Sequence, residues 1–264
     1  MQFKALVVSF FLAIAAIPAS ATGYATDATD LWWTATESGW GVNVVQQEEI
    51  LFLTFFVYGP DGKAIWYVAP ATSYVGPSAT QGLLYVGPVY LSNGAYLGGQ
   101  YSPNTTTAVG TVTFSLENVG SANITYNVGS VTVTKQVTRL TWRNSIVTGN
   151  YLGGEIGVYF NCTNANNNGV FEIPSSIGLT HSGSNLTMVS SYTGTTSSCT
   201  YTGPYKQEGR MGSFSGTFTC TGGVNGTFTA IEIEASISAV GMRLASTSAQ
   251  CSYNGRFGGV RRTQ

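Results

Sequence analysis

Residues 50–68, ILFLTFFVYGPDGKAIWYV, determine the fold class of this chain. The part from Ile50 to Tyr58 is almost wholly apolar and rich in β-branched and aromatic residues, which predicts a strand covered on both faces. Pro60-Asp61-Gly62 is a turn signal, and Ile65-Trp66-Tyr67-Val68 predicts the return strand of a hairpin.

The same pattern of short strands and glycine-containing turns continues through the rest of the chain. Alternation with a period of two predicts strands, and no stretch of about eleven residues keeps a helical period. The predicted strands are residues 41–46, 50–58, 64–69, 83–91, 109–117, 121–128, 130–142, 155–161, 169–173, 186–192, 198–205, 212–220, 226–236, 239–245 and 252–260. We therefore expect an all-β protein.

Three short sequences of the first half recur in the same order in the second. The matches are 85–90 with 201–205, 110–114 with 216–220, and 137–140 with 241–244. The recurrence of short sequences in the same order in both halves indicates a repeated structural unit. We expect two tandem antiparallel halves of about seven to eight strands each, as barrels or two-sheet sandwiches. Their expected bounds are residues 22–150 and 151–264.

A transmembrane barrel is an alternative for so many strands. The predicted strands are short and interrupted by glycine, which disfavours a continuous lipid-facing band.

The first residues predict export. Lys4 precedes an apolar run from Ala5 to Ile17, and Ala19-Ser20-Ala21 has the small-x-small pattern of a signal peptidase site. The run is shorter than the roughly twenty residues that span a bilayer. We therefore expect a signal peptide over residues 1–21, a secreted or periplasmic mature protein, and no membrane span after cleavage.

The composition limits the classes of partner that the chain can bind. Charged residues make up 9% of the chain and its formal net charge is −1. Nucleic acids and anionic membranes are bound by concentrated Lys and Arg, so we expect neither as a partner. The 12% aromatic content provides enough apolar area for folded cores.

The four cysteines lie in the second half, and an even count in an exported chain predicts disulfides. Cys199 and Cys220 are placed symmetrically about a turn at residues 207–210, so they should face each other across a hairpin. Cys162 and Cys251 then pair and join the first and last strands of that half. A metal site is the competing interpretation, which the long spacings disfavour.

The densest motif lies just before the opening hairpin. It consists of Glu37-Ser38-Gly39-Trp40-Gly41-Val42-Asn43, then Gln46, Phe55-Phe56, Tyr58, Gly62 and Trp66. This stretch resembles an ESGWG segment of many uncharacterised exported bacterial proteins. The chain departs from their pattern at Phe55, where Trp is usual, and at Ala64, where Pro is common. The resemblance implies an exported bacterial β protein and no particular activity.

Two interpretations of this aromatic segment remain open. Trp40, Phe56 and Trp66 either fill a barrel as core or line a ligand cavity or sugar-stacking face. Glu37 lies among aromatic residues, where the pKa of a carboxyl group can rise. We expect an exported, non-enzymatic protein that binds a small molecule, a glycan or a cell-surface partner, with no cofactor and no metal. The candidate ligand-binding residues are Glu37, Trp40, Asn43, Tyr58, Trp66 and Tyr67.

Two other functions stay open. A polysaccharide hydrolase would use Glu37 or the pair Glu232 and Glu234, since paired carboxylates serve glycoside hydrolysis. Ile231, Ile233 and Ala235 alternate with these glutamates, which instead predicts that the pair forms a solvated row on the outer face of the strand. A structural role in an envelope or matrix is the other alternative. The sequence contains no GxSxG, and its one histidine lies in a predicted turn, so serine-hydrolase chemistry is disfavoured.

Overall fold

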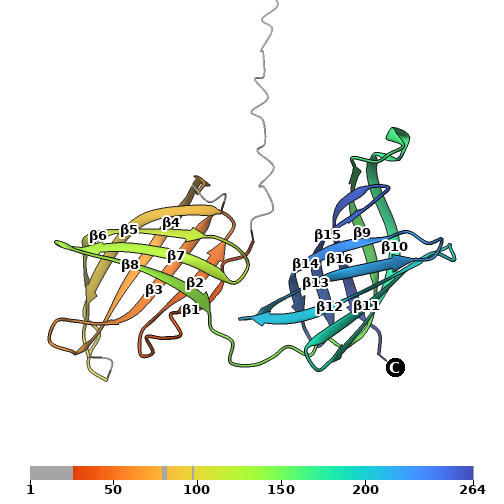
Figure 1. The fold of residues 1–264 in the computed structure, drawn as a ribbon. Helices are drawn as coiled ribbons and strands as arrows, with labels where there is room; N and C mark the ends of the chain where they lie inside the picture. Colours follow the sequence, from red (N-terminus) through yellow and green to blue (C-terminus); the bar gives the residue numbers. More distant parts are fainter. Residues whose placement is uncertain (1–25, 79–81, 97, 264) are drawn as a thin grey trace, which may run out of the picture.

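The computed structural model describes residues 26–78, 82–96 and 98–263, and these form two closed antiparallel barrels of eight strands each (Figure 1). In each barrel every strand pairs with its neighbour in sequence, and the first strand pairs with the last to close the wall. The all-β prediction and the prediction of two tandem halves are confirmed, and the halves are barrels. The predicted signal peptide, residues 1–21, lies outside the described residues.

The first barrel consists of β1 (Asp30–Trp33), β2 (Gly41–Gln47), β3 (Ile50–Tyr58), β4 (Ala64–Pro77), β5 (Leu83–Asn93), β6 (Thr105–Leu116), β7 (Ser121–Val128) and β8 (Val131–Arg139). The second consists of β9 (Gly149–Phe160), β10 (Gly169–Ser182), β11 (Asn185–Tyr192), β12 (Ser198–Glu208), β13 (Met211–Cys220), β14 (Asn225–Ala235), β15 (Ala239–Ser248) and β16 (Ser252–Arg261). One helical turn, η1 (Ala165–Asn167), follows β9.

The strand β1 is not predicted from the sequence, because four residues are too few to establish a period. Residues 140–148 connect the barrels, so the second barrel begins at Gly149, slightly before the predicted boundary at residue 151.

Each barrel is filled by side chains from alternate strand positions. On β3, Leu51, Leu53 and Phe55 are fully buried, whereas Phe52 and Phe56 lie on the outer face and are exposed. The expectation that both faces of this strand are covered is therefore wrong. The barrel wall is one layer thick, and no other described segment packs over the outer face of β3.

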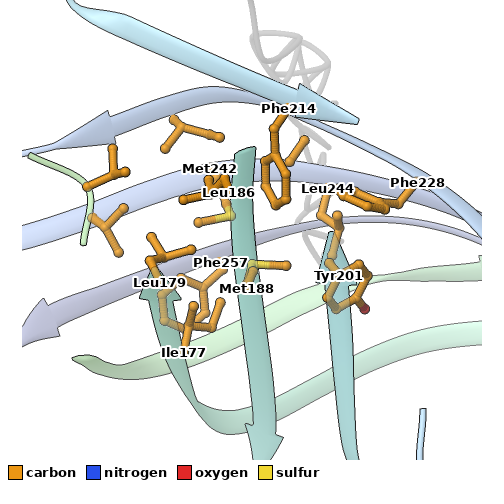
Figure 2. Packing of buried hydrophobic residues seen from close by; sticks show 14 of the residues in the cluster. Ile177, Leu179, Leu186, Met188, Tyr201, Phe214, Phe228, Met242, Leu244 and Phe257 are labelled. Carbon is orange, nitrogen blue, oxygen red and sulfur yellow. The ribbon is translucent and has the colours of Figure 1, made fainter. Parts of the chain in front are cut away.

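The second barrel is filled in the same way. Figure 2 shows Leu186, Met188 and Met242 gathered inside it with several phenylalanines. Phe214 and Phe228 pack edge to face with ring centroids 4.7 Å apart. Both barrels are thus closed around filled cores.

The sequence matches between the halves are displaced by one strand. They relate β5 to β12, β6 to β13 and β8 to β15. Tyr85 and Tyr201 match and are both buried, but the third match relates exposed Thr138 to buried Met242. The matches therefore do not follow strand order, although each barrel closes in the same way, by pairing of its first strand with its last.

Two disulfides stabilise the second barrel, with the pairing that the sequence predicts. Cys199 and Cys220 are direct partners across β12 and β13. Cys162 and Cys251 join the end of β9 to the start of β16, at the seam where the barrel closes. Disulfides of this kind are typical of oxidising compartments outside the cytoplasm.

The first barrel contains a fully buried guanidinium at its end. The Arg139 side chain is 0% exposed and lies 3.3 Å from the carboxylate of Asp30. It also donates hydrogen bonds to the carbonyl oxygens of Asp27, Thr29 and Val119. Burial lowers the pKa of Arg139, and the negative charge of Asp30 opposes this shift.

The hairpin between β12 and β13 attaches the second barrel to this end of the first. The backbone N–H of Arg210 donates to Asp30 Oδ2 at 2.9 Å, and Arg210 Nε donates to the carbonyl oxygen of Thr29 at 3.0 Å. The backbone N–H of Gly209 donates to Thr141 Oγ1 at 2.8 Å. Arg210 also pairs with Asp27. In Figure 1 this hairpin extends from the second barrel toward the first.

The two disulfides should stabilise the fold to different degrees. Cys162–Cys251 closes a loop of sequence separation 89, against 21 for Cys199–Cys220. The entropy of loop closure predicts a loss of about 4.6 kcal/mol for the double variant C162A/C251A and about 3.3 kcal/mol for C199A/C220A. Urea unfolding of the oxidised proteins measures both values. A larger loss for C199A/C220A would contradict the prediction.

Gly209→Ala should loosen the junction between the barrels. Gly209 has φ +62°, and an added Cβ would lie 2.0 Å from Asp30 Oδ2. Gly194 is the matched control, because it has φ +78° and open space around it. We expect G209A to increase proteolytic cleavage within residues 140–148 and G194A to leave it unchanged. Equal cleavage in both variants would show that the close approach is unimportant.

Candidate functional site

Three of the six predicted ligand-binding residues lie together at one end of the first barrel. Glu37, Trp40 and Tyr58 line a shallow cavity of about 250 Å³ with Tyr126 and Lys135. We call these five residues the mouth cluster. Its members come from the β1–β2 connection, the end of β3, and strands β7 and β8.

The local sequence explains how Trp40 reaches this position. Gly39 has φ +108°, a conformation that favours glycine, and a Cβ added there would lie 3.7 Å from the Tyr58 hydroxyl. The chain therefore reverses before Trp40, and the indole packs against the core of the first barrel while remaining partly exposed.

Glu37 forms an ion pair with Lys135, whose Nζ lies 2.9 Å and 2.7 Å from the two carboxylate oxygens. The hydrogen bond from Lys135 lowers the pKa of Glu37, and a hydrogen bond from Trp40 acts in the same direction. The aromatic neighbours of Glu37 do not raise its pKa, because the carboxylate is exposed and has a cationic partner. A glycosidase general acid requires a raised pKa, so Glu37 does not suit that role.

Two further predicted residues, Asn43 and Trp66, lie on the outer wall of the barrel. Trp66 is the direct cross-strand partner of Phe56, and both side chains are 51% exposed. Asn43 pairs with Thr54 in the next row of the same face, and Val45 pairs with Phe52 in the row after that. The interpretation of Phe56 and Trp66 as barrel core is therefore wrong.

We call this surface of β2, β3 and β4 the outer aromatic face. Its members are Asn43, Val45, Phe52, Thr54, Phe56, Trp66 and Val68.

Tyr67, the sixth predicted residue, points inward and packs against the core. It lies close to Tyr126, whose pKa is raised first by burial and then by Tyr67. The structure thus does not bring the six residues into one pocket. Trp40 belongs to the mouth cluster and Trp66 to the outer aromatic face.

Lys135, Tyr126 and Phe52 are not among the residues that the sequence predicts for a site. Lys135 and Tyr126 are distant in sequence from Glu37, and only closure of the barrel brings them to the mouth cluster. Phe52 was within reach, since an alternating strand places it on the same face as Phe56.

Glu232 and Glu234 do not form a solvated row. A β-bulge shifts the register between Ile231 and Glu234, and Glu232 has a positive φ of 54°. Glu232 lies mostly buried, 3.1 Å from Arg243, and Glu234 pairs with Arg210. Both line one small cleft, but each carboxylate already has an arginine partner.

The second barrel encloses one acidic side chain. Glu155 is buried, and burial raises the pKa of its carboxyl group. The rings of Tyr159 and Tyr253 beside it have centroids 4.8 Å apart, and Tyr159 also contacts Phe171. These ring contacts fill the space around Glu155, so the cluster forms part of the barrel core.

In the described ranges, no group of three or more His, Cys, Asp or Glu side chains is arranged to hold a metal ion. The same part of the chain has no helix of the length and apolarity that crossing a membrane requires.

No protein-family model and no curated protein matches the chain. Among solved structures, it is similar to the crystal structure of a protein of unknown function from the DUF3598 family of Nostoc punctiforme. The two are 8% identical, the match covers 89% of this chain and 94% of that chain, and the TM-score is 0.25.

The Glu37–Lys135 pair predicts an acid-dependent contribution to stability. Because the folded-state pKa lies below the ordinary 4.5, the pair stabilises the protein above that pH. The contribution is lost as the pH falls through the lowered pKa. We expect the Glu37 carboxyl carbon to titrate below 4.5 by NMR, and Lys135→Met to move its midpoint upward.

Lys63→Met is the matched control, because Lys63 pairs with Asp61 in the β3–β4 turn. It should leave the Glu37 midpoint in place. An unchanged midpoint in K135M would contradict the role assigned to Lys135.

Proposed function

We propose that this chain is an exported binding protein that presents the outer aromatic face of its first barrel to a glycan. The observation that carries the proposal is the pair Phe56 and Trp66, which lie side by side on adjacent strands and are each half exposed. Aromatic side chains normally bury their area, so a contiguous exposed group of them is typical of a binding surface.

The chemistry of the face favours a neutral polyol. Its three rows contain no charged side chain, and Asn43 and Thr54 lie between the aromatic row and the row of Val45 and Phe52. A sugar ring has apolar C–H faces that pack on aromatic rings, and hydroxyl groups that pair with amide and hydroxyl side chains. The outer aromatic face offers aromatic rings and polar side chains in neighbouring rows.

The cellular location agrees with this ligand class. The two disulfides suit an oxidising compartment, and the predicted signal peptide would deliver the chain there. Bacterial polysaccharides are abundant in that compartment and beyond it. The ion-paired states of Glu37, Glu232 and Glu234 favour binding over hydrolysis.

Binding to insoluble polysaccharides tests the proposal. Purified peptidoglycan, chitin and cellulose are incubated with the oxidised protein, and the fraction that sediments with each polymer is measured. We expect retention on at least one of them, and at least a tenfold loss of affinity in W66A and F56A. Trp142→Ala is the matched control, since Trp142 is an exposed tryptophan outside this face, and it should bind like the wild type.

Absence of retention on all three polymers would overturn the glycan proposal. So would equal binding by W66A and the wild type. Sedimentation velocity detects the structural alternative: concentration-dependent self-association that W66A abolishes, without retention on any polymer, would assign this face to assembly instead.

A further inference from the structure

A second and larger depression lies between the two barrels. The connecting segment, residues 140–148, forms one wall, and the β12–β13 and β14–β15 hairpins of the second barrel form the other. Its volume is about 550 Å³, within the range of small-molecule sites. We call it the junction groove. It shares no residue with the mouth cluster or the outer aromatic face.

The groove is electropositive. Its lining includes Arg143, Arg210 and Arg261 but one acidic residue, Asp30. Asp30 is already neutralised by Arg139 at 3.3 Å and accepts the Arg210 backbone N–H. Arg210 is itself paired with carboxylates, so Arg143 and Arg261 supply the uncompensated charge.

Arg261 is held in place by neutral acceptors. Its guanidinium donates to the carbonyl oxygens of Thr148 and Ile146, both at 2.9 Å, and to the Tyr151 hydroxyl at 2.7 Å. None of these cancels its charge, and its Nε is buried without an acceptor among the described residues. Arg143 is exposed, and within the same ranges it has no ion-pair partner. An anion would neutralise both arginines.

Large apolar side chains lie beside these charges. Trp142 is 75% exposed and Ile237 is 93% exposed, from opposite walls of the groove. Ile146 is also exposed. Neither barrel core includes these side chains, and together they offer an apolar surface next to two cations.

We propose that the junction groove binds a small amphiphilic carboxylate. Its anionic group lies at Arg143 and Arg261, and its apolar chain or ring packs between Trp142 and Ile237. The combination of charge and apolar area selects this ligand class. A simple anion would leave Trp142 and Ile237 in water, and a neutral lipid would leave the arginines unpaired.

Calorimetric titration of the oxidised protein tests the proposal with three probes. Decanoate has both features, decanol lacks the charge, and butyrate lacks most of the apolar chain. We expect decanoate to bind at least tenfold more tightly than either of the others. Equal affinity for decanol and decanoate would overturn the proposal.

Variants locate the site. Both Arg143→Gln and Trp142→Ala change exposed side chains, so the variants should fold, and each should weaken decanoate binding at least tenfold. Arg262→Gln removes the same charge from an exposed position outside the groove and is the matched control. Equal losses of decanoate affinity in R143Q and R262Q would overturn the assignment of the site. So would decanoate binding that occurs only when phosphatidylglycerol vesicles are present. Trp66→Ala should leave decanoate binding intact, which separates this test from that of the glycan proposal.

Discussion

The arrangement of the two barrels depends on the buried ion pair between Arg139 and Asp30. Taking a guanidinium out of water is unfavourable by several kcal/mol unless its charge and its donors are satisfied. Asp30 neutralises the charge, and carbonyl oxygens of neighbouring loops accept the remaining hydrogen bonds. Arg139 also lies 4.6 Å from the ring centroid of Trp32. One side chain thus joins β8, β1 and two loops.

The same pair positions the second barrel. Asp30 accepts hydrogen bonds from both the Arg139 guanidinium and the Arg210 backbone N–H, so its carboxylate contacts both barrels. Removal of one partner of a buried pair typically costs about 3–5 kcal/mol, because the other charge stays buried. Asp30 also lines the junction groove, next to the hairpins of the second barrel. A structural ion pair therefore borders the site that we assign to an anion.

Much of the architecture was predictable from the sequence, because local sequence patterns determine strands and turns. Alternation and turn chemistry identify most strands, and the symmetric spacing about the β12–β13 turn identifies the Cys199–Cys220 pair. The short strand β1 escaped, because its place depends on pairing with β8, which is distant in sequence. The bulge at Glu232 also escaped, since alternating residues give no sign of a register shift.

The candidate sites were harder to predict, for a physical reason. Aromatic residues have the same apolar character inside and outside a barrel, so composition alone does not separate Phe55 from Phe56. Only their positions in the alternating pattern of the strand distinguish them. Phe55 points into the core, and Phe56 lies on the outer aromatic face. The junction groove arises from tertiary contact between distant segments. Arg261 reaches the segment that carries Trp142 and Arg143 only once β16 has paired with β9, which closes the second barrel.

The pairing of the first strand of each barrel with its last has a consequence for the order of folding during synthesis. The first barrel can complete its wall when β8 appears and pairs with β1, before the strands of the second barrel are made. The second barrel closes in the same way when β16 appears and pairs with β9. Until then β9 and β15 expose unpaired edges, which are prone to wrong pairing. Cys251 immediately precedes β16, so oxidation can lock this seam only once the chain has been made as far as the last strand of the barrel.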